Sequence, residues 1–357
     1  EGGIEQGGFV MEAPVGVWRN AFELDNSMEY PSAIITGNFG PDTKVNPADY
    51  PDGYPFPVTI TKGGRVYRRD KESIMATVLR NLASARQSLK DQMKTEKNSE
   101  RLMVLDRQQR VMKENMNSWY GVLGSGRTEK TKNRPFRLAD PDIGSDITET
   151  AREHNDWNKR YINKRTLWFC DEGVYIEKDY IPPSLMAMEL RFGTLYQDTD
   201  SCKVAILNHD EVEAAIRPFT EEDVIDMANI LCKELNESFD DFVKECLNVD
   251  KNEFFNIKPD AYYKRYFQWG VKKRYAYLDY NNKKGYRGVE MRRSSTPQIV
   301  KDIQQAMFEA ILNGAGRVEI GKLLRDMVDD LLNPEITPSM NFGQPFGVKK
   351  KGTFAHK

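Results

Sequence analysis

Two aspartates separated by one residue, Asp198 and Asp200, carry the clearest chemical signal in the sequence. Apolar and β-favouring residues flank them on both sides, from Leu195 to Val204. Such residues around a short polar turn predict a β-hairpin with both carboxylates at its tip. Carboxylates held this close repel each other unless a cation lies between them, and Mg²⁺ binds such oxygen ligands together with substrate phosphates. The alternative is a solvated aspartate-rich turn, which is the commoner meaning of a lone D-x-D pattern.

A third carboxylate, Asp25, ends a strand that is predicted over Ala21–Leu24. Pro31 then suits the first turn of a helix, so that Tyr30 lies on the turn into this helix. Because a strand end can converge with a hairpin tip on a neighbouring strand, we expect Asp25 to form one cluster with the two hairpin aspartates. Taken alone, Asp25 also fits an ordinary aspartate in front of a helix.

Two helices are predicted between these carboxylate motifs. Apolar residues recur every three or four positions from about Glu72 to Lys94, and a second helix is predicted from about Arg101 to Tyr120. The short polar turn between them makes an αα-hairpin, which would present Arg86, Lys90 and Lys113 together. Three cations on facing helices can hold a triphosphate, although each of them alone is more often an ordinary solvated residue.

Length and composition are those of a globular protein with two or three domains. The sequence has 357 residues, of which 39% are hydrophobic and 30% are charged. No apolar run approaches the length of a membrane span, and no secretory signal is found at the start. The four cysteines and three histidines are scattered without zinc-ligand spacing, so we expect reduced cysteines inside a cell.

The formal net charge of −2 is not that of a general nucleic-acid binder, but the charges are segregated. Acidic residues dominate Glu221–Asp250, within a long amphipathic helix predicted over about Glu221–Leu247. Local basic surfaces can hold a polyanion despite a nearly neutral total. The basic residues cluster at Lys62–Arg69, Arg127–Arg137, Lys264–Arg274, Lys283–Arg293 and Lys349–Lys351.

Four short motifs follow one another along the chain: D-N-S-M-E-Y-P-S (Asp25 to Ser32), K-E-N-M-N-S-W-Y-G (Lys113 to Gly121), Y-Q-D-T-D-S (Tyr196 to Ser201) and K-K-R-Y (Lys272 to Tyr275). Together they resemble the polymerase module of a family B DNA polymerase, of viral or archaeal type. That family usually carries D-x-x-S-L-Y-P-S, K-x-x-x-N-S-x-Y-G, Y-G-D-T-D-S and K-K-R-Y. Each motif alone is weak, whereas four in this order make a chance match very improbable.

The resemblance implies an α+β fold, with an antiparallel-sheet palm covered by helices on one face, helical-hairpin fingers and the start of a mostly helical thumb. The implied order is palm at residues 1–66, fingers at 67–122, palm again at 123–290 and the beginning of the thumb at 291–357. Residues from about 158 to 185 are extra relative to most members. We expect them to form one or two hairpins that pack on the surface or contact DNA.

The implied activity is template-directed DNA synthesis from deoxynucleoside triphosphates on primer–template DNA. In it, a primer 3′-hydroxyl attacks the α-phosphate of the incoming nucleotide with the help of two Mg²⁺ ions, which Mn²⁺ can replace. The resemblance assigns Asp25 and Asp200 as bridging metal ligands, with Asp198 as a weaker ligand or orienting group. The cations that would neutralise the triphosphate are Arg86, Lys90 and Lys113.

Other residues gain roles from the same resemblance. The ring of Tyr30 would lie under the sugar and exclude a 2′-hydroxyl group. Asn117 and Tyr120 would line the pocket of the nascent base pair. The primer–template backbone would be held by Lys272, Lys273, Arg274 and Tyr275. We expect a cytoplasmic protein with no membrane contact, in the host cytoplasm or nucleoid if it is viral.

The sequence also departs from the family. Met28 and Glu29 replace the usual Ser-Leu, Gln197 replaces a glycine, and Asp260 lies where the family often has a further acidic residue. The family's upstream exonuclease and most of its thumb are missing, so we expect a split polymerase completed by separate polypeptides. A second hypothesis is a non-catalytic DNA-binding or scaffolding subunit derived from a polymerase. The retained carboxylates and cations favour the catalytic hypothesis.

Overall fold

The computed structural model describes residues 10–123, 138–333, 335 and 343, and the chain divides into two compact units. The first unit comprises the residues up to Met11, Phe22–Pro218 and Ile225–Asp260. The second comprises Glu12–Ala21, Phe219–Val224 and the residues from Ala261 onward. The basic segments predicted at 127–137 and 349–351 lie outside the described residues.

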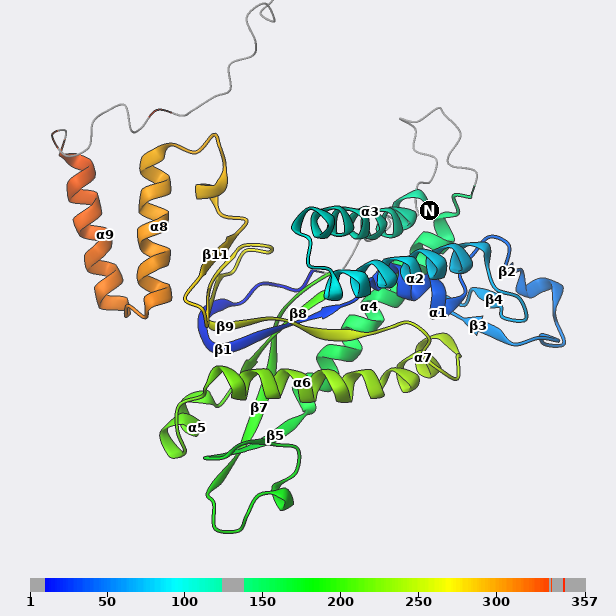
Figure 1. Ribbon diagram of the computed structural model, residues 1–357, viewed down its shortest axis with the longest axis horizontal. Coiled ribbons are helices and arrows are strands. Elements are labelled where there is room, and N and C mark those ends of the chain that lie inside the picture. Colours follow the sequence, from blue (N-terminus) through cyan, green and yellow to red (C-terminus); the bar gives the residue numbers. More distant parts are fainter. Residues whose placement is uncertain (1–9, 124–137, 334, 336–342, 344–357) are drawn as a thin grey trace, which may run out of the picture. The chain divides into compact units, whose positions relative to one another are not determined.

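An antiparallel sheet forms the centre of the first unit, with the strand order β1-β8-β7-β5-β6 (Figure 1). Successive residues point to opposite faces, which is why burial alternates along parts of β1 and β5, whereas β8 is buried on both faces from Cys202 to Ile206. The strands are β1 (Val15–Asn26), β5 (Thr166–Cys170), β6 (Gly173–Tyr175), β7 (Ala187–Asp198) and β8 (Ser201–Ile206). The predicted α+β fold with an antiparallel sheet is confirmed.

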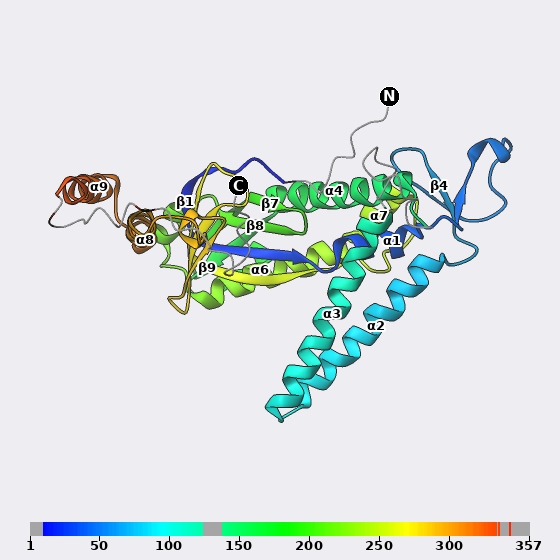
Figure 2. The ribbon, with the colours of Figure 1, turned by 90° about the horizontal axis from the view of Figure 1, so that it is seen from above.

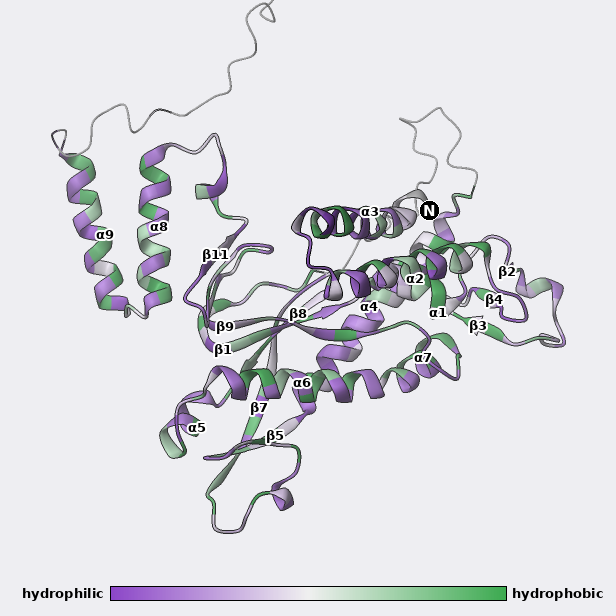
Figure 3. Cartoon of the chain, in the orientation of Figure 1, coloured by the Kyte–Doolittle hydropathy of each residue, from purple (hydrophilic) through white to green (hydrophobic). Residues whose placement is uncertain are grey.

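Amphipathic helices accompany this sheet. Helix α4 (Pro141–Lys164) contacts β7 and β8. Arg165, the residue that follows α4, donates two hydrogen bonds of 2.7 Å to Glu234 of α6 (Glu221–Glu237). Figure 3 shows hydrophobic and hydrophilic residues alternating along α6, as expected for a helix with one buried face. The shorter helices are α5 (His209–Ala215) and α7 (Phe239–Leu247).

The predicted helical hairpin is confirmed as α2 (Ile74–Thr95) and α3 (Ser99–Leu123), which lie side by side in both views (Figures 1 and 2). Ser73 caps α2, since its hydroxyl accepts a 2.9 Å hydrogen bond from the Ala76 amide. The polar turn between the helices contains Glu96, Lys97 and Asn98. These residues interrupt the apolar pattern, which is why the turn could be predicted from the sequence.

Helix α1 (Glu29–Gly37) follows β1, and a small three-stranded sheet follows α1. The strand order of this sheet is β2-β4-β3, with β2 (Lys44–Val45), β3 (Val58–Ile60) and β4 (Val66–Arg68). It lies in the region that is rich in Pro and Gly, where short strands bounded by turns are expected.

Two sequence-based predictions need correction. The helix predicted over Glu221–Leu247 is interrupted at Ser238, whose hydroxyl donates a 2.7 Å hydrogen bond to the Leu235 carbonyl and accepts one from the Trp157 indole. In the segment predicted as one or two hairpins, the residues up to Lys164 continue α4 because Ile162 extends its buried face. The remaining hairpin, β5–β6, is joined to the main sheet by the pairing of β5 with β7.

In the described part of the second unit, the start of β1 and the start of α6 are joined by three further strands and two further helices. Aromatic residues form much of its interior: Phe267, Trp269, Tyr286 and Phe308 pack around Ala276, Leu278 and Leu312. The strands are β9 (Ile257–Trp269), which enters this unit at Ala261, β10 (Tyr275–Asp279) and β11 (Lys284–Arg287), followed by α8 (Gln298–Asn313) and α9 (Arg317–Leu332). Among the residues that the structure describes, no helix combines the length and apolar character needed to cross a membrane.

Candidate active site

The end of β1 and the tip of the β7–β8 hairpin meet at one edge of the sheet. Asp25 pairs with Ser201, and the Asn26 amide donates a 2.7 Å hydrogen bond to the Asp200 carbonyl. At the tip, Thr199 has a φ of 58°, and the Asp200 amide donates a 2.6 Å bond to the Asp198 carbonyl. The predicted hairpin with both aspartates at its tip is confirmed, and β-sheet pairing fixes Asp25 beside it.

Side-chain amides fix this edge further, in a group that we call the amide cluster: Asn26, Asn155, Asn158 and Gln197. Asn155 on α4 donates to the Thr199 carbonyl at 2.6 Å, and Gln197 donates to the Asn155 carbonyl at 2.7 Å. Asn158 donates to the Asn26 side chain at 3.1 Å. All four residues are buried, so each of these hydrogen bonds would be costly to lose. Gln197 therefore ties the hairpin to α4 instead of only filling a turn position.

The carboxylates at this edge are electrostatically strained. Partial burial and the nearby Asp200 raise the pKa of Asp25 to about 6, with a smaller contribution from Asp260. Lys258 and Lys113 oppose this rise, and the Lys258 Nζ lies 3.9 Å from Asp25 Oδ2. Desolvation by the surrounding protein raises the pKa of Asp200 as well, together with Glu29 and Asp198. A pair of carboxylates with raised pKa values is an environment that a bound cation would stabilise.

The carboxylates at this edge are the candidate ligands for a metal ion. Within the described parts of the chain, no group of three or more Asp, Glu, His or Cys side chains is arranged to hold a metal ion. Asp25 and Asp200 interact directly, whereas Asp198 acts on Asp200 from the other end of the turn. Mg²⁺ commonly uses one or two protein carboxylates, with waters and substrate phosphates as its other ligands. The residues present fit a metal of that kind.

Basic side chains gather opposite the carboxylates. Desolvation and the neighbouring Arg86, Lys258 and Lys113 together lower the pKa of Lys90. Desolvation also lowers the pKa of Arg86, whose Nε donates a 3.2 Å bond to Gln109. The structure thus brings the predicted Arg86, Lys90 and Lys113 together and adds Lys258 from β9. Cations that destabilise one another in this way favour an anion between them.

The predicted nucleotide-pocket residues lie at the start of α1 and on α3. The Tyr30 and Tyr120 rings pack with their centroids 4.4 Å apart and an interplanar angle of 33°. Burial, Tyr120 and Glu29 raise the pKa of Tyr30 to about 12, so its hydroxyl remains protonated at neutral pH. Asn117 is exposed on α3, one turn from Lys113.

The K-K-R-Y element belongs to the second unit, in the connection from β9 to β10. Lys272 forms an ion pair of 2.8 Å with Glu12, and Arg274 forms one of 3.1 Å with Glu290. Lys273 has a φ of 62°, and the Tyr275 ring packs against Tyr266 at 5.4 Å. The element is a structured turn with its aromatic residue packed against the interior of that unit.

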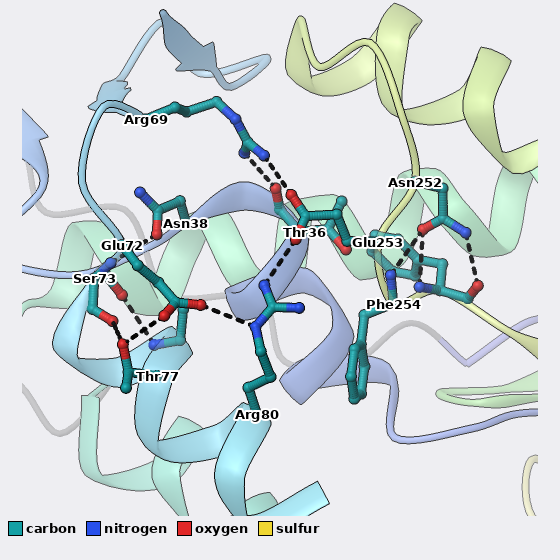
Figure 4. A network of polar contacts seen from close by, with 12 residues as sticks. Thr36, Asn38, Arg69, Glu72, Ser73, Thr77, Arg80, Asn252, Glu253 and Phe254 are labelled. Carbon is teal, nitrogen blue, oxygen red and sulfur yellow. Dashed lines mark hydrogen bonds and ion pairs between the residues drawn. The ribbon is translucent and has the colours of Figure 1, made fainter. Parts of the chain in front are cut away.

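A network of polar contacts fixes the beginning of α2 (Figure 4). Glu253, in the loop before β9, accepts hydrogen bonds of 2.7 Å from Arg69 and from Arg80 of α2. Arg80 also donates to Glu72 at 2.9 Å, and the Ser73 amide donates to the Asn38 side chain at 2.8 Å. The base of the helical hairpin is therefore tied to the loop that leads to Lys258.

Sequence reasoning missed the amide cluster, Lys258 and a buried pair formed by Glu29 and His154. A signal for part of this set was available on α4, since His154 and Asn155 fall on the same face as the apolar Ile147 and Ala151. Polar residues on the buried face of a helix predict buried hydrogen bonds. Their partners Glu29 and Thr199 lie 125 and 44 positions away along the chain, and no local pattern identifies them.

Comparison with known proteins gives one consistent result. The model of DNA polymerase family B matches residues 2–339. The chain is 26% identical over 337 residues to DNA polymerase 1 of Pyrococcus abyssi, covering 93% of this chain and 35% of that protein. It is 25% identical over 338 residues to the DNA polymerase of Thermococcus gorgonarius, with the same coverage. The chain thus spans about a third of the length of the curated relatives it matches.

A solved structure shares the fold. The family B DNA polymerase from the archaeon Pyrobaculum calidifontis superposes with a TM-score of 0.56 at 20% identity. The match covers 93% of this chain and 34% of that one. The named relatives are archaeal.

Proposed function

Since the chain belongs to DNA polymerase family B, we propose that it adds deoxynucleotides to a primer 3′-hydroxyl under the direction of a DNA template. The observation that carries this proposal is the separation of charge within the first unit. Asp25 and Asp200 have raised pKa values, and they face a group of cations in which the pKa of Lys90 is lowered. A metal-bound triphosphate would relieve both kinds of repulsion at once.

The carboxylates would act on the metal side. Asp25 and Asp200 would hold Mg²⁺, with Asp198 orienting the hairpin tip, and the bound metal would supply charge stabilisation for the attacking and leaving oxygens. The amide cluster keeps the two carboxylates in place before substrate arrives, so little reorganisation is needed during the reaction.

The basic residues and tyrosines would act on the nucleotide side. Arg86, Lys90 and Lys113 would bind the triphosphate and neutralise the departing pyrophosphate. The Tyr30 ring, packed on Tyr120, would exclude a ribose 2′-hydroxyl group, and Asn117 would border the base pair. The K-K-R-Y residues of the second unit would hold the primer–template backbone by phosphate contacts, which position DNA without reading its sequence.

We assign the parts of the chain accordingly. In this proposal, residues 1–66 and 123–290 would belong to the palm, residues 67–122 to the fingers, and residues 291–357 to the beginning of the thumb. A location in the cytoplasm or nucleoid stays a prediction, as does the role of the hairpin β5–β6.

Primer extension with Mg²⁺ tests the proposal directly. Asp200→Asn is expected to lower the rate of incorporation about a thousandfold or more, because a metal ligand contributes several kcal/mol to the transition state. The matched control is Asp52→Asn, which changes an exposed aspartate in the loop before β3. Incorporation by Asp200→Asn at the rate of the control would contradict the metal assignment.

The alternative function, a DNA-binding or scaffolding subunit, predicts a different result in the same assay. Such a protein would bind primer–template DNA but would incorporate no nucleotide with Mg²⁺ or Mn²⁺. The retained carboxylate pair and the cation group favour the catalytic function.

The hypothesis of a split polymerase is tested by co-purification. If separate polypeptides supply an exonuclease and a thumb, the tagged chain should co-purify with them from its own source, and processive synthesis should require them. Processive synthesis by the 357-residue chain alone would contradict the hypothesis.

A further inference from the structure

Glu29 lies at the start of α1, directly before Tyr30, and its side chain is buried. Only 4% of the residue is exposed. Its carboxylate oxygens lie 2.9 Å and 3.1 Å from Nδ1 of His154 on α4, and His154 is fully buried. The carboxylate therefore points into the protein, away from solvent, and links the first turn of α1 to α4.

Three aromatic rings surround His154 and fix the orientation of its imidazole. The ring centroids of Phe239, Phe242 and Phe255 lie 4.6 Å, 5.0 Å and 4.5 Å from that of His154. In the tautomer that carries the proton on Nδ1, His154 donates this hydrogen bond to the Glu29 carboxylate. Because the bond lies in an apolar environment, it is stronger than an exposed one and holds Glu29 in one conformation.

The entry into α1 needs such an anchor, because the helix has no side-chain cap of its own. Met28, at the N-cap position, has a φ of 54° and makes no side-chain cap hydrogen bond. One turn further along the helix, the Ser32 hydroxyl donates to the Met28 carbonyl at 2.9 Å and lies 3.3 Å from the Phe254 carbonyl. The turn that carries Tyr30 is thus held by two side chains, Ser32 and Glu29.

We propose that the Glu29–His154 pair is a positioning device that sets the place of the Tyr30 ring and thereby the preference for deoxynucleotides. The inference rests on the proposed polymerase function and on the role of Tyr30 within it. Tyr30 packs against Tyr120 but is only partly buried, so the backbone of the first helical turn determines where its ring lies. A directional hydrogen bond restricts that backbone more tightly than an apolar contact of similar size would.

The discriminating measurement is the ratio of kcat/KM for a deoxynucleotide to kcat/KM for the matching ribonucleotide. Both values come from one enzyme preparation, so losses of stability or of active fraction cancel in the ratio. Tyr30→Ala is the reference and should lower the ratio most. Glu29→Ala should lower it about three- to tenfold, which is the effect of a side chain moved off its preferred conformation.

Two further variants separate positioning from simple loss of packing. Glu29→Gln keeps an oxygen that accepts from Nδ1, and it should leave the ratio within about twofold of the wild type. His154→Phe removes the donor but suits the aromatic surroundings, and it should lower the ratio as Glu29→Ala does. The double variant Glu29→Ala/His154→Phe should lower the ratio no more than either single variant does, because the two residues act as one unit.

The outcomes distinguish the inference from the function on which it rests. If Tyr30→Ala lowers the ratio while Glu29→Ala and His154→Phe leave it unchanged, the positioning role is wrong and the polymerase function stands. If Tyr30→Ala leaves the ratio unchanged in an active enzyme, the sugar-excluding role and the positioning role both fall. A wild-type chain that incorporates no nucleotide would overturn the inference together with the proposed function.

Discussion

The carboxylate edge and the cation group of the first unit face the same site but are held in different ways. Asp25 and Asp200 are short side chains on a β-sheet edge, and backbone hydrogen bonds and the buried amide cluster fix their positions. Lys90 and Lys113 are long side chains on the helical hairpin, which carries exposed apolar residues such as Met103 and Val111. We call the carboxylate edge the rigid side, because backbone pairing fixes it, and the cation group the adaptable side, because its long side chains have many rotamers.

This difference fits a division of labour in catalysis. Carboxylates that repel one another must be held by the fold, because they would otherwise separate, and a bound cation would add to the partial compensation that Lys258 and Lys113 give. Long basic side chains can follow a triphosphate as it arrives and a pyrophosphate as it leaves. The metal side is therefore expected to define the geometry of the reaction, and the cation side its substrate affinity.

The largest expected effect that tests this division comes from the cation side. Lys113→Ala should lower kcat/KM for the incoming nucleotide about 10- to 100-fold, because a cation beside the triphosphate is lost, while primer–template affinity changes little. Steady-state incorporation and a DNA-binding titration give the two values. The control is Lys97→Ala, which removes an exposed lysine at the turn of the same hairpin.

The reverse order would count against the division. If Lys113→Ala weakened DNA binding more than nucleotide use, the hairpin would act on the template and not on the triphosphate. If Lys113→Ala lowered kcat/KM no more than Lys97→Ala does, Lys113 would have no role in the site.

The sequence predicted the elements of this site far better than their supports. Alternating residues around Asp198 and Asp200 predicted the hairpin, and helical spacing predicted the α2–α3 pair, because both signals lie within short windows. The clustering of Asp25 with the hairpin followed from strand ends meeting at one sheet edge. The hairpin and the helix pair depend on local geometry alone, whereas the clustering of Asp25 depends on which strands pair.

The supports depend on residues that meet only in the folded chain. Asn155 reaches Thr199 across 44 positions, and Lys258 approaches Asp25 from a strand that no motif marked. Glu29 stands where the family usually has leucine, and the structure places it inside, against His154, where it also contributes to the raised pKa of Asp200. The sequence offers no local pattern for such pairs, since partner choice is set by tertiary packing.

On the rigid side, the burial and repulsion that raise the pKa of Asp25 should make the free energy of unfolding depend on pH. The pKa of Asp25 is raised from 3.8 to about 6 on folding, so the folded chain binds the proton more tightly than the unfolded chain does. Stability is therefore lost as pH rises from about 4 to 6, and the loss is complete above that range. Asp25→Asn, which carries no charge, should be more stable than the wild type by about 1–3 kcal/mol near pH 8.

Urea unfolding in EDTA at about pH 4 and pH 8 measures this difference. The two proteins should differ at the higher pH and converge at the lower one. Asp52→Asn serves as the control and should match the wild type at both. An Asp25→Asn protein that is less stable than the wild type at pH 8 would mean that the carboxylate is stabilised, not strained, in the fold.

The smallest expected effect concerns the base of the adaptable side. Glu253 bridges Arg69 and Arg80 and so ties the start of α2 to the loop before β9 (Figure 4). Because the Glu253 side chain is 36% exposed, Glu253→Ala should destabilise the protein by only about 1 kcal/mol, and less at about 1 M NaCl, where such pairs are screened. Thermal unfolding at low and high salt, with Asp52→Ala as the control, measures both effects. If the loss of stability in Glu253→Ala were the same at low and high salt, Glu253 would act through packing and not through its ion pairs. The base of the hairpin would then be held by packing, as the carboxylate edge is held by buried contacts.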